Sequence, residues 1–208
     1  MFKDIFRLGL FLLIVTAVSA LLLAVIFNVT DPQIKENARK TEEEARLEVL
    51  PQAQTFQRRA FAKEDGDSVV VYCGYQNEKL VGYTFIASQY GYSSEIKTMV
   101  GITPEFQIQG IKVLFQQETP GLGANCEAVE SNVTLWQTLS GNAPAETSVA
   151  KPKFQQQFEG LTMDKLLVDK DGGTITSMTG ATITSRTITE SIRFQMEKLK
   201  SVLEGAAL

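Results

Sequence analysis

The stretch Ser68-Val69-Val70-Val71-Tyr72-Cys73 decides the class of fold. Its odd-numbered side chains face one way and its even-numbered side chains the other, which is the two-residue period of a β-strand. A second strand-like run, Leu80 to Ala87, follows after the polar turn Gln76–Lys79. Two such runs joined by a short polar turn predict a β-hairpin.

Further segments continue this pattern towards the C-terminus. Thr103-Pro104-Glu105 and Asp171-Gly172-Gly173 have the residues of tight turns. Because short turns join successive strands, the sheet is predicted to be antiparallel and meandering. The additional strand candidates are Ile96–Ile102, Phe106–Gln109, Ile111–Phe115 and Leu161–Lys170.

The C-terminal segment has the three-to-four-residue period of an amphipathic helix. Its apolar positions are Ile188, Ile192, Met196, Leu199 and Leu203. The tract Ala124–Gln157 has no long period and predicts short helices and loops. The expected fold class is therefore α+β, an antiparallel sheet flanked by helices and preceded by one N-terminal transmembrane helix.

The transmembrane helix is predicted from the uncharged, apolar run Leu8 to Thr30. A helix of this length can cross a hydrocarbon core of about 30 Å. A signal peptide is the alternative, but its apolar region is only roughly 7–15 residues long and ends in a small-residue cleavage site that this run lacks. Lys3 and Arg7 precede the run, so we expect a cytoplasmic N-terminus and an extracytoplasmic domain in the cell membrane.

A second, charged helix is expected beyond the membrane. Asp31-Pro32 has the residues of a helix start, with Asp as N-cap and Pro at the first helical position, and Pro51 is expected to end the helix. This helix is either a stalk or docking surface, or a solvated helix that leans on the domain. The chain therefore divides into residues 1–30, 31–51 and 52–208.

Composition excludes several classes of function. The net charge of −4 and the absence of a basic stripe argue against nucleic acid as a partner. The chain has no His, so its own side chains provide no histidine base, haem ligand or histidine zinc ligand. Cys73 and Cys126 are too few for an iron–sulfur cluster. An extracytoplasmic disulfide between them is possible, although the strand pattern favours Cys73 as a small buried side chain.

The run Thr179-Gly180-Ala181-Thr182-Ile183-Thr184-Ser185 comes just before the C-terminal helix. Two small residues between hydroxyl groups let a ligand approach the backbone, and free N–H groups at a helix start favour an anion such as phosphate. The simpler interpretation is an ordinary N-cap. A second run, Glu118-Thr119-Pro120-Gly121-Leu122-Gly123, follows a predicted strand and by itself is a tight turn.

Together with the membrane anchor, these two runs resemble the FMN-binding components of bacterial respiratory complexes over nearly the whole chain. The closest resemblance is to the G subunit of the Rnf electron-transport complex, and the C subunit of the sodium-translocating NADH:quinone reductase is its relative. The most specific part is Thr-Gly-Ala-Thr-Ile-Thr-Ser, residues 179–185. The family often has Asp at the position of Thr176, which bears on recognition by the flavin transferase that attaches the cofactor.

The resemblance implies that Thr182 carries FMN through a phosphoester bond to the flavin's phosphate. The cofactor would then carry out the redox chemistry, and the protein would position it. The residues implied to shape the phosphate site are Thr179, Gly180, Ala181, Thr184 and Ser185. Those implied to line the flavin or its ribityl chain are Glu118, Thr119, Gly121, Leu122 and Gly123.

By resemblance, the protein is an electron-carrying component of an ion-translocating ferredoxin:NAD oxidoreductase, is not catalytic alone, and works with other membrane subunits. Three alternatives stay open. One is the FMN-carrying component of the quinone reductase. Another is a membrane-tethered module that binds a phosphate-bearing ligand reversibly, and the third is a structural anchor with a vestigial motif.

Overall fold

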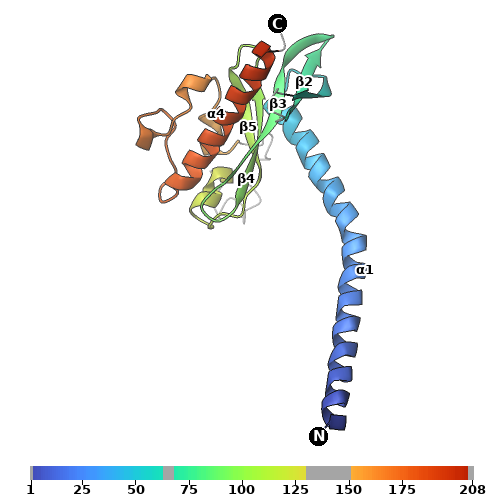
Figure 1. Ribbon diagram of the computed structural model, residues 1–208. Coiled ribbons are helices and arrows are strands. Elements are labelled where there is room, and N and C mark those ends of the chain that lie inside the picture. Colours follow the sequence, from blue (N-terminus) through green and yellow to red (C-terminus); the bar gives the residue numbers. More distant parts are fainter. Residues whose placement is uncertain (1, 63–67, 130–150, 206–208) are drawn as a thin grey trace, which may run out of the picture. The chain divides into compact units, whose positions relative to one another are not determined.

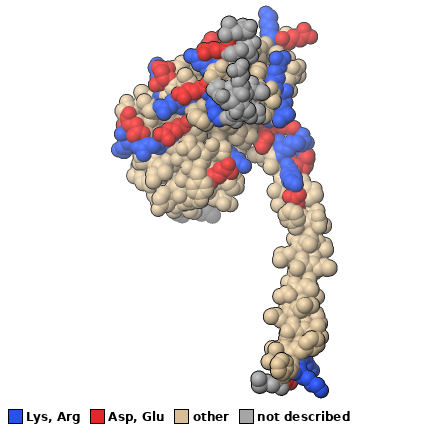
Figure 2. All heavy atoms as spheres, viewed as in Figure 1, with Lys and Arg blue, Asp and Glu red and all other residues tan. Residues whose placement is uncertain are grey.

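The computed structural model describes residues 2–62, 68–129 and 151–205. The chain forms two compact units, Met1–Glu43 and Glu44–Leu208 (Figure 1). Helix α1, Phe2–Val49, supplies the whole of the first unit and contributes its last turns to the second. Within the described residues, it is the one helix long and apolar enough to cross a membrane. Figure 2 shows its apolar stretch as a surface without Lys, Arg, Asp or Glu between charged groups at both ends.

The expected helix start at Asp31-Pro32 is wrong, because α1 is continuous and Pro32 lies inside it. Proline removes one backbone donor and costs roughly 3 kcal/mol within a helix. The apolar residues before it have no alternative to helix inside a membrane, since every backbone group there must be paired internally. On the other side, ion pairs one turn apart support the helix, among them Lys35 with Asp31 and Arg39 with Glu43.

The second unit contains a five-stranded antiparallel sheet in the order β1-β2-β3-β4-β5. This confirms the predicted meander and fold class. The hairpin predicted from Ser68 onward is β2 with β3. The sequence reasoning missed β1, whose residues are mostly exposed and therefore lack a clear alternation. The strands are β1 Thr55–Ala62, β2 Ser68–Gln76, β3 Lys79–Tyr90, β4 Glu95–Ile102 and β5 Ile108–Phe115.

Two other predictions need correction. Phe106–Gln109 and Ile111–Phe115 are not separate strands, because β5 continues through Gly110. Leu161–Lys170 is not a strand either. It contains the short 3-10 helices η2, Met163–Lys165, and η3, Asp169–Asp171. Only the isolated bridges Gln107–Thr162 and Val168–Ile175 form beside them, because the two 3-10 helices interrupt the extended chain.

The predicted closing helix is confirmed as α4, Thr182–Gly205. It packs on one face of the sheet, mainly against β3 and β4 (Figure 1). Four of its predicted apolar positions, Ile188, Ile192, Met196 and Leu199, are completely buried in the main core, and the fifth, Leu203, packs against it partly buried. In the tract expected to hold short helices, the structure shows η1, Gly123–Glu127, and α3, Lys153–Gln156, while residues 130–150 lie outside the described residues.

A second, smaller core holds the end of α1 against the sheet. Ala45 and Val49 are buried with Met99 of β4. The backbone of Val49 lies so close to the sheet that a Cβ atom on Gly101 would be 2.3 Å from its carbonyl oxygen. The glycine in β4 therefore makes room for the helix end.

The cysteines are both buried and both free, so the disulfide that the sequence left open does not form in this structure. Cys73 packs in the core on β2, as its alternating position predicted. Burial raises the pKa of the Cys126 thiol to about 12. Both thiols therefore act as small apolar core groups.

Candidate functional site

A cavity of about 550 Å³ lies where three segments meet. These are the turn between β3 and β4, the loop that follows β5, and the first turn of α4. Its volume falls within the range of small-molecule sites, roughly 300–1,000 Å³. The lining residues are Tyr92, Glu118, Thr119, Leu122, Gly123, Gly180, Ala181, Thr182, Ile183 and Thr184.

The start of α4 contributes backbone and hydroxyl groups to the lining of this cavity. Gly180 has a φ of 74°, a left-handed conformation that favours glycine, and turns the chain into the helix. The first helical hydrogen bond runs from the N–H of Ser185 to the carbonyl of Ala181 at 3.1 Å. The N–H groups of residues 182–184 therefore have no partner within the helix, and the positive end of its dipole adds to their field. This end can bind an anion.

Thr182 lies at this helix start and lines the cavity half-buried. Its hydroxyl makes no hydrogen bond to any other described residue. Ile183 beside it is 50% exposed. The hydroxyl of Thr182 is thus available to a ligand in the cavity.

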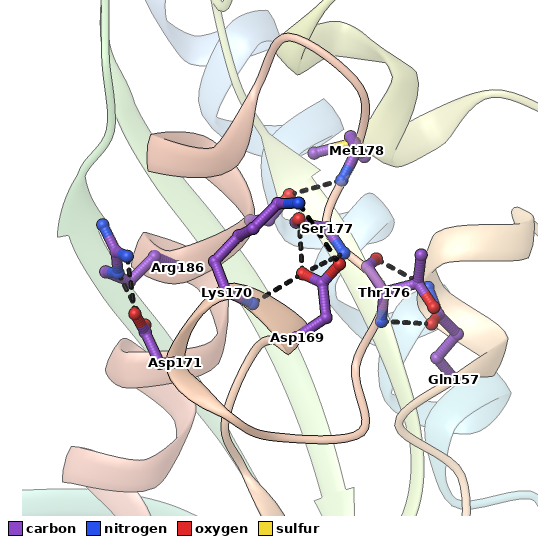
Figure 3. A network of polar contacts seen from close by, with 9 residues as sticks. Gln157, Asp169, Lys170, Asp171, Thr176, Ser177, Met178 and Arg186 are labelled. Atoms are coloured by element: carbon purple, nitrogen blue, oxygen red, sulfur yellow. Dashed lines mark hydrogen bonds and ion pairs between the residues drawn. The ribbon is translucent and has the colours of Figure 1, made fainter.

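The segment that leads into α4 is held by a polar network (Figure 3). The Asp169 carboxylate accepts hydrogen bonds from the hydroxyl and the N–H of Ser177. The Gln157 side chain pairs with both backbone groups of Thr176. Figure 3 also shows the hydrogen bond that Met178 donates through its N–H to the Ser185 hydroxyl, at 2.9 Å. These contacts fix the approach to Gly180.

An ion pair anchors α4 itself. The Arg186 guanidinium donates two hydrogen bonds of 2.7 Å to the carboxylate of Asp171 (Figure 3). The hydrogen bond from Arg186 lowers the pKa of this Asp171 carboxyl. Hydrogen bonds from Ser177 likewise lower the pKa of Asp169. Both carboxylates are ionised at neutral pH. Asp171 holds the turn around Gly172 to α4, and Asp169 holds it to the segment that precedes α4.

Glu118 links all three segments of the site. One carboxylate oxygen accepts hydrogen bonds from the N–H groups of Ser93 and Ser94, at 2.9 and 3.1 Å. The other accepts a hydrogen bond of 2.7 Å from the Thr184 hydroxyl. Glu118 is only 6% exposed. Burial by itself would raise the pKa of Glu118, but the hydrogen bonds from Ser93, Thr184 and Ser94 together outweigh this effect. The pKa of the carboxyl is therefore lower than its ordinary value. The group is therefore a buried, ionised carboxylate.

The loop around Glu118 is shaped by its glycines. Gly121 is in the left-handed region at a φ of 77°. A Cβ atom on Gly123 would lie 2.7 Å from both the Glu118 side chain and the Thr184 hydroxyl oxygen. The absence of a side chain at Gly123 therefore permits the contact between Glu118 and Thr184. The loop is closed by the N–H groups of Leu122 and Ala124, which both donate to the carbonyl of Thr119.

The structure brings together most of the residues predicted from sequence. Eight line the cavity, from both predicted runs. Three do not. Thr179 and Gly121 are exposed outside it, and Ser185 is buried with its hydroxyl bonded to the Ala181 carbonyl. Sequence reasoning missed Tyr92 and Ile183. The signal for Tyr92 was an aromatic residue between Gly91 and two serines, in the turn between two predicted strands.

The donor set fits a phosphate-bearing cofactor rather than a metal. The lining combines the free N–H groups of the helix start and the Thr182 hydroxyl with the exposed apolar side chains of Leu122 and Ile183. Among the described residues, no group of three or more His, Cys, Asp or Glu side chains could hold a metal ion. Fold and site together define a cofactor-binding α+β domain that follows an apolar anchor helix.

Comparison with known proteins agrees with this class. Residues 91–197 match the family model of the FMN-binding domain, and residues 1–49 match that of the RnfG N-terminal region. The chain is 30% identical to the G subunit of an ion-translocating oxidoreductase complex from Methanosarcina acetivorans, over 98% of each protein. It is 32% identical to the G subunit of the Na⁺-translocating ferredoxin:NAD⁺ oxidoreductase complex of Acetobacterium woodii, over 94% of this chain and 91% of that protein.

The chain therefore belongs to the FMN-binding domain family and, within it, to the RnfG proteins, which are components of ion-translocating oxidoreductase complexes. A crystal structure of NqrC from Shewanella oneidensis is similar with a TM-score of 0.44 and 18% identity, over 76% of this chain and 74% of that one.

Proposed function

We propose that this protein is the membrane-anchored, electron-carrying flavoprotein component of an ion-translocating ferredoxin:NAD oxidoreductase complex, with FMN attached through its phosphate to Thr182. The observation that carries the proposal is the position of Thr182. Thr182 lines the cavity at the start of α4, its hydroxyl makes no hydrogen bond to any other described residue, and the chain belongs to the RnfG family. When bound, FMN supplies one- and two-electron redox chemistry.

The attachment follows from the chemistry of the Thr182 hydroxyl. A bond forms between its oxygen and the flavin phosphorus, the hydroxyl proton is lost, and a leaving group departs from an activated flavin donor. No described residue beside Thr182 is a general base, because the one carboxylate in the cavity, Glu118, already accepts three hydrogen bonds. We therefore assign activation to a separate flavin transferase.

The chain's own residues would then hold the phosphate in place. The free N–H groups at the start of α4 favour its negative charge, and Gly180 and Ala181 allow close approach. A side chain at Gly180 would be strained because its φ is positive, and a Cβ atom would be 2.9 Å from the Leu122 side chain, which would have to shift. The Thr184 hydroxyl already donates its hydrogen bond to Glu118, so Thr184 affects the phosphate only indirectly.

The surroundings of the site suit an electron carrier. Tyr92, Leu122 and Ile183 line the cavity and are 69%, 42% and 50% exposed. A ring held there stays close to solvent, where it can exchange electrons with partner subunits. Lys3 and Arg7 before the apolar stretch of α1 favour an extracytoplasmic domain. The partners are accordingly other membrane subunits of the complex.

The second candidate is a module that binds a phosphate-bearing ligand reversibly. It is favoured by the same free N–H groups, which need no covalent bond to bind an anion. The two candidates differ in denaturing conditions. Flavin fluorescence that stays with the polypeptide after denaturing electrophoresis supports the covalent carrier, and loss of all fluorescence supports reversible binding.

The decisive experiment is coexpression of the chain with a flavin transferase, followed by intact mass and peptide mapping. Thr182→Ala should lose the FMN-sized mass addition completely, and Thr182→Ser should keep part of it because the hydroxyl remains. Thr179→Ala is the matched control, since it removes a neighbouring hydroxyl that does not line the cavity. FMN found on another residue of the Thr182→Ala chain would refute the site assignment.

A further inference from the structure

Tyr92 is an aromatic residue that the chain leaves largely uncovered. It lines the cavity, yet it is 69% exposed. Aromatic rings contribute most to stability or binding when they are buried, in a protein core or at an interface. The exposed ring at the cavity therefore offers an apolar, electron-rich surface to a ligand.

The turn that carries Tyr92 is held firmly. The two N–H groups that follow it, from Ser93 and Ser94, are bound by the buried Glu118 carboxylate. The N–H of Gly91 donates to the carbonyl of Ser94 at 2.7 Å. The Tyr90 hydroxyl donates to the carbonyl of Ser93 at 2.8 Å. Tyr92 is thus presented at the cavity by hydrogen bonds on both sides of it.

The cavity lining holds two chemically different sets of groups. The first turn of α4 supplies N–H groups and the Thr182 hydroxyl, whereas Tyr92, Leu122 and Ile183 supply exposed aromatic and apolar side chains, and Tyr92 comes from a separate segment, the turn between β3 and β4. FMN has the same division, with a charged phosphate at one end and a flat, largely apolar ring system at the other. The N–H groups and the Thr182 hydroxyl suit the phosphate, which leaves the aromatic and apolar side chains for the ring.

We propose that Tyr92 is a cofactor-contacting residue whose ring packs against the isoalloxazine of FMN. The assignment rests on the proposed function, because it requires FMN in this cavity. Glu118 is then a positioning residue, since it holds the turn that carries Tyr92. Two measurable consequences follow from contact between the rings.

The first consequence is fluorescence quenching. An excited oxidised flavin takes one electron from a phenol ring in contact with it, and the electron returns to the phenol, so the flavin loses its emission without net chemistry. The second is a lower flavin reduction potential. The electron-rich phenol stabilises the electron-poor oxidised ring more than the electron-rich reduced ring. Both effects require contact and fall off steeply with separation.

The experiment uses the full chain in detergent, loaded with FMN by coexpression with a flavin transferase. Tyr92→Leu keeps an apolar side chain and removes the aromatic ring, and Tyr92→Trp restores an electron donor. Phe194→Leu is the matched control, because Phe194 is also an exposed aromatic residue, at 55%, but lies on α4 outside this cavity. Intact mass first establishes equal loading, and fluorescence lifetime and flavin potential are then measured.

We expect a longer flavin lifetime and a higher potential in Tyr92→Leu, strong quenching in Tyr92→Trp, and no change in Phe194→Leu. Equal lifetimes and potentials for Tyr92→Leu and wild type, at equal loading, would overturn the proposal. If wild type shows no mass addition, covalent attachment fails, and the same variants are titrated with free FMN. Quenching of added FMN by wild type but not by Tyr92→Leu would still support the contact, and equal quenching would refute it.

Discussion

Removal of the Glu118 carboxylate should loosen all three segments of the site. Glu118→Ala deprives two backbone N–H groups and the Thr184 hydroxyl of a charged acceptor at 2.7–3.1 Å. Each hydrogen bond to a charged group contributes roughly 1.5–3 kcal/mol. Water from the adjacent cavity can replace part of the lost hydrogen bonding. The variant is also relieved of the free-energy cost of burying a carboxylate. We expect a net loss of about 3 kcal/mol in the free energy of unfolding.

This loss can be measured by urea unfolding of the full chain in detergent, followed by near-ultraviolet circular dichroism. With a dependence of about 1–3 kcal/mol per molar urea, the midpoint should fall by roughly 1–3 M. Glu118→Gln keeps the shape and most hydrogen bonds and should lose about 1 kcal/mol. Glu95→Ala is the control, because its carboxylate accepts a hydrogen bond from Ser88 but is exposed. Equal midpoints for Glu118→Ala and Glu95→Ala would refute the reasoning.

The same carboxylate predicts a dependence of stability on pH. The pKa of Glu118 in the folded protein lies below its ordinary value of 4.5. A lowered folded pKa means that the stabilisation is fully present above pH 4.5 and is lost as the pH falls through the folded value. The stability difference between wild type and Glu118→Gln should therefore be constant at neutral pH and shrink below pH 4.5. A difference that grows on acidification would contradict this sign.

Two further substitutions test the packing around the site and the sheet. Gly101→Ala places a Cβ atom 2.3 Å from the carbonyl oxygen of Val49 and should lower the free energy of unfolding by roughly 1–3 kcal/mol. Gly110→Ala is the control, because its Cβ atom would be 3.5 Å from Val49, an ordinary contact distance. Equal urea midpoints for the two variants would show that α1 does not pack as described. Asp169→Asn should weaken the two hydrogen bonds from Ser177 and speed hydrogen exchange of the Ser177 amide. The midpoint of global urea unfolding should not change. Unchanged amide exchange would show that the network does not order the approach to α4.

Local pattern was sufficient wherever one physical factor dominated. The alternation from Val69 to Cys73 predicted β2 because one face of that strand is buried and the other is not. The spacing of Ile188, Ile192 and Met196 predicted α4 for the same reason. Strand β1 lacked this signal because it is mostly exposed, so nothing in its sequence separates it from a loop. Only hydrogen bonds to β2 make it a strand.

Context overruled local signals at two points. Asp31-Pro32 has the residues of a helix start, but the apolar residues before it are already helical and the helix continues. Residues 161–170 were predicted as a strand, yet the 3-10 helices η2 and η3 interrupt them, and only the isolated bridges Gln107–Thr162 and Val168–Ile175 form. In both places the outcome depends on neighbouring segments, which a short window of sequence does not contain.

The site shows the same division. By itself, the sequence determined the apolar helix, strands β2 to β4 and most of β5, the closing helix and the two runs at residues 118–123 and 179–185, because period, length and turn chemistry are local properties. Only the tertiary structure decided that Glu118 accepts a hydrogen bond from Thr184, which is 66 residues away in the sequence. It also decided that the turn between β3 and β4, which carries Tyr92, completes the cavity. Hydrogen bonds and cavities depend on distances in space, and those are set by how the sheet and α4 pack together.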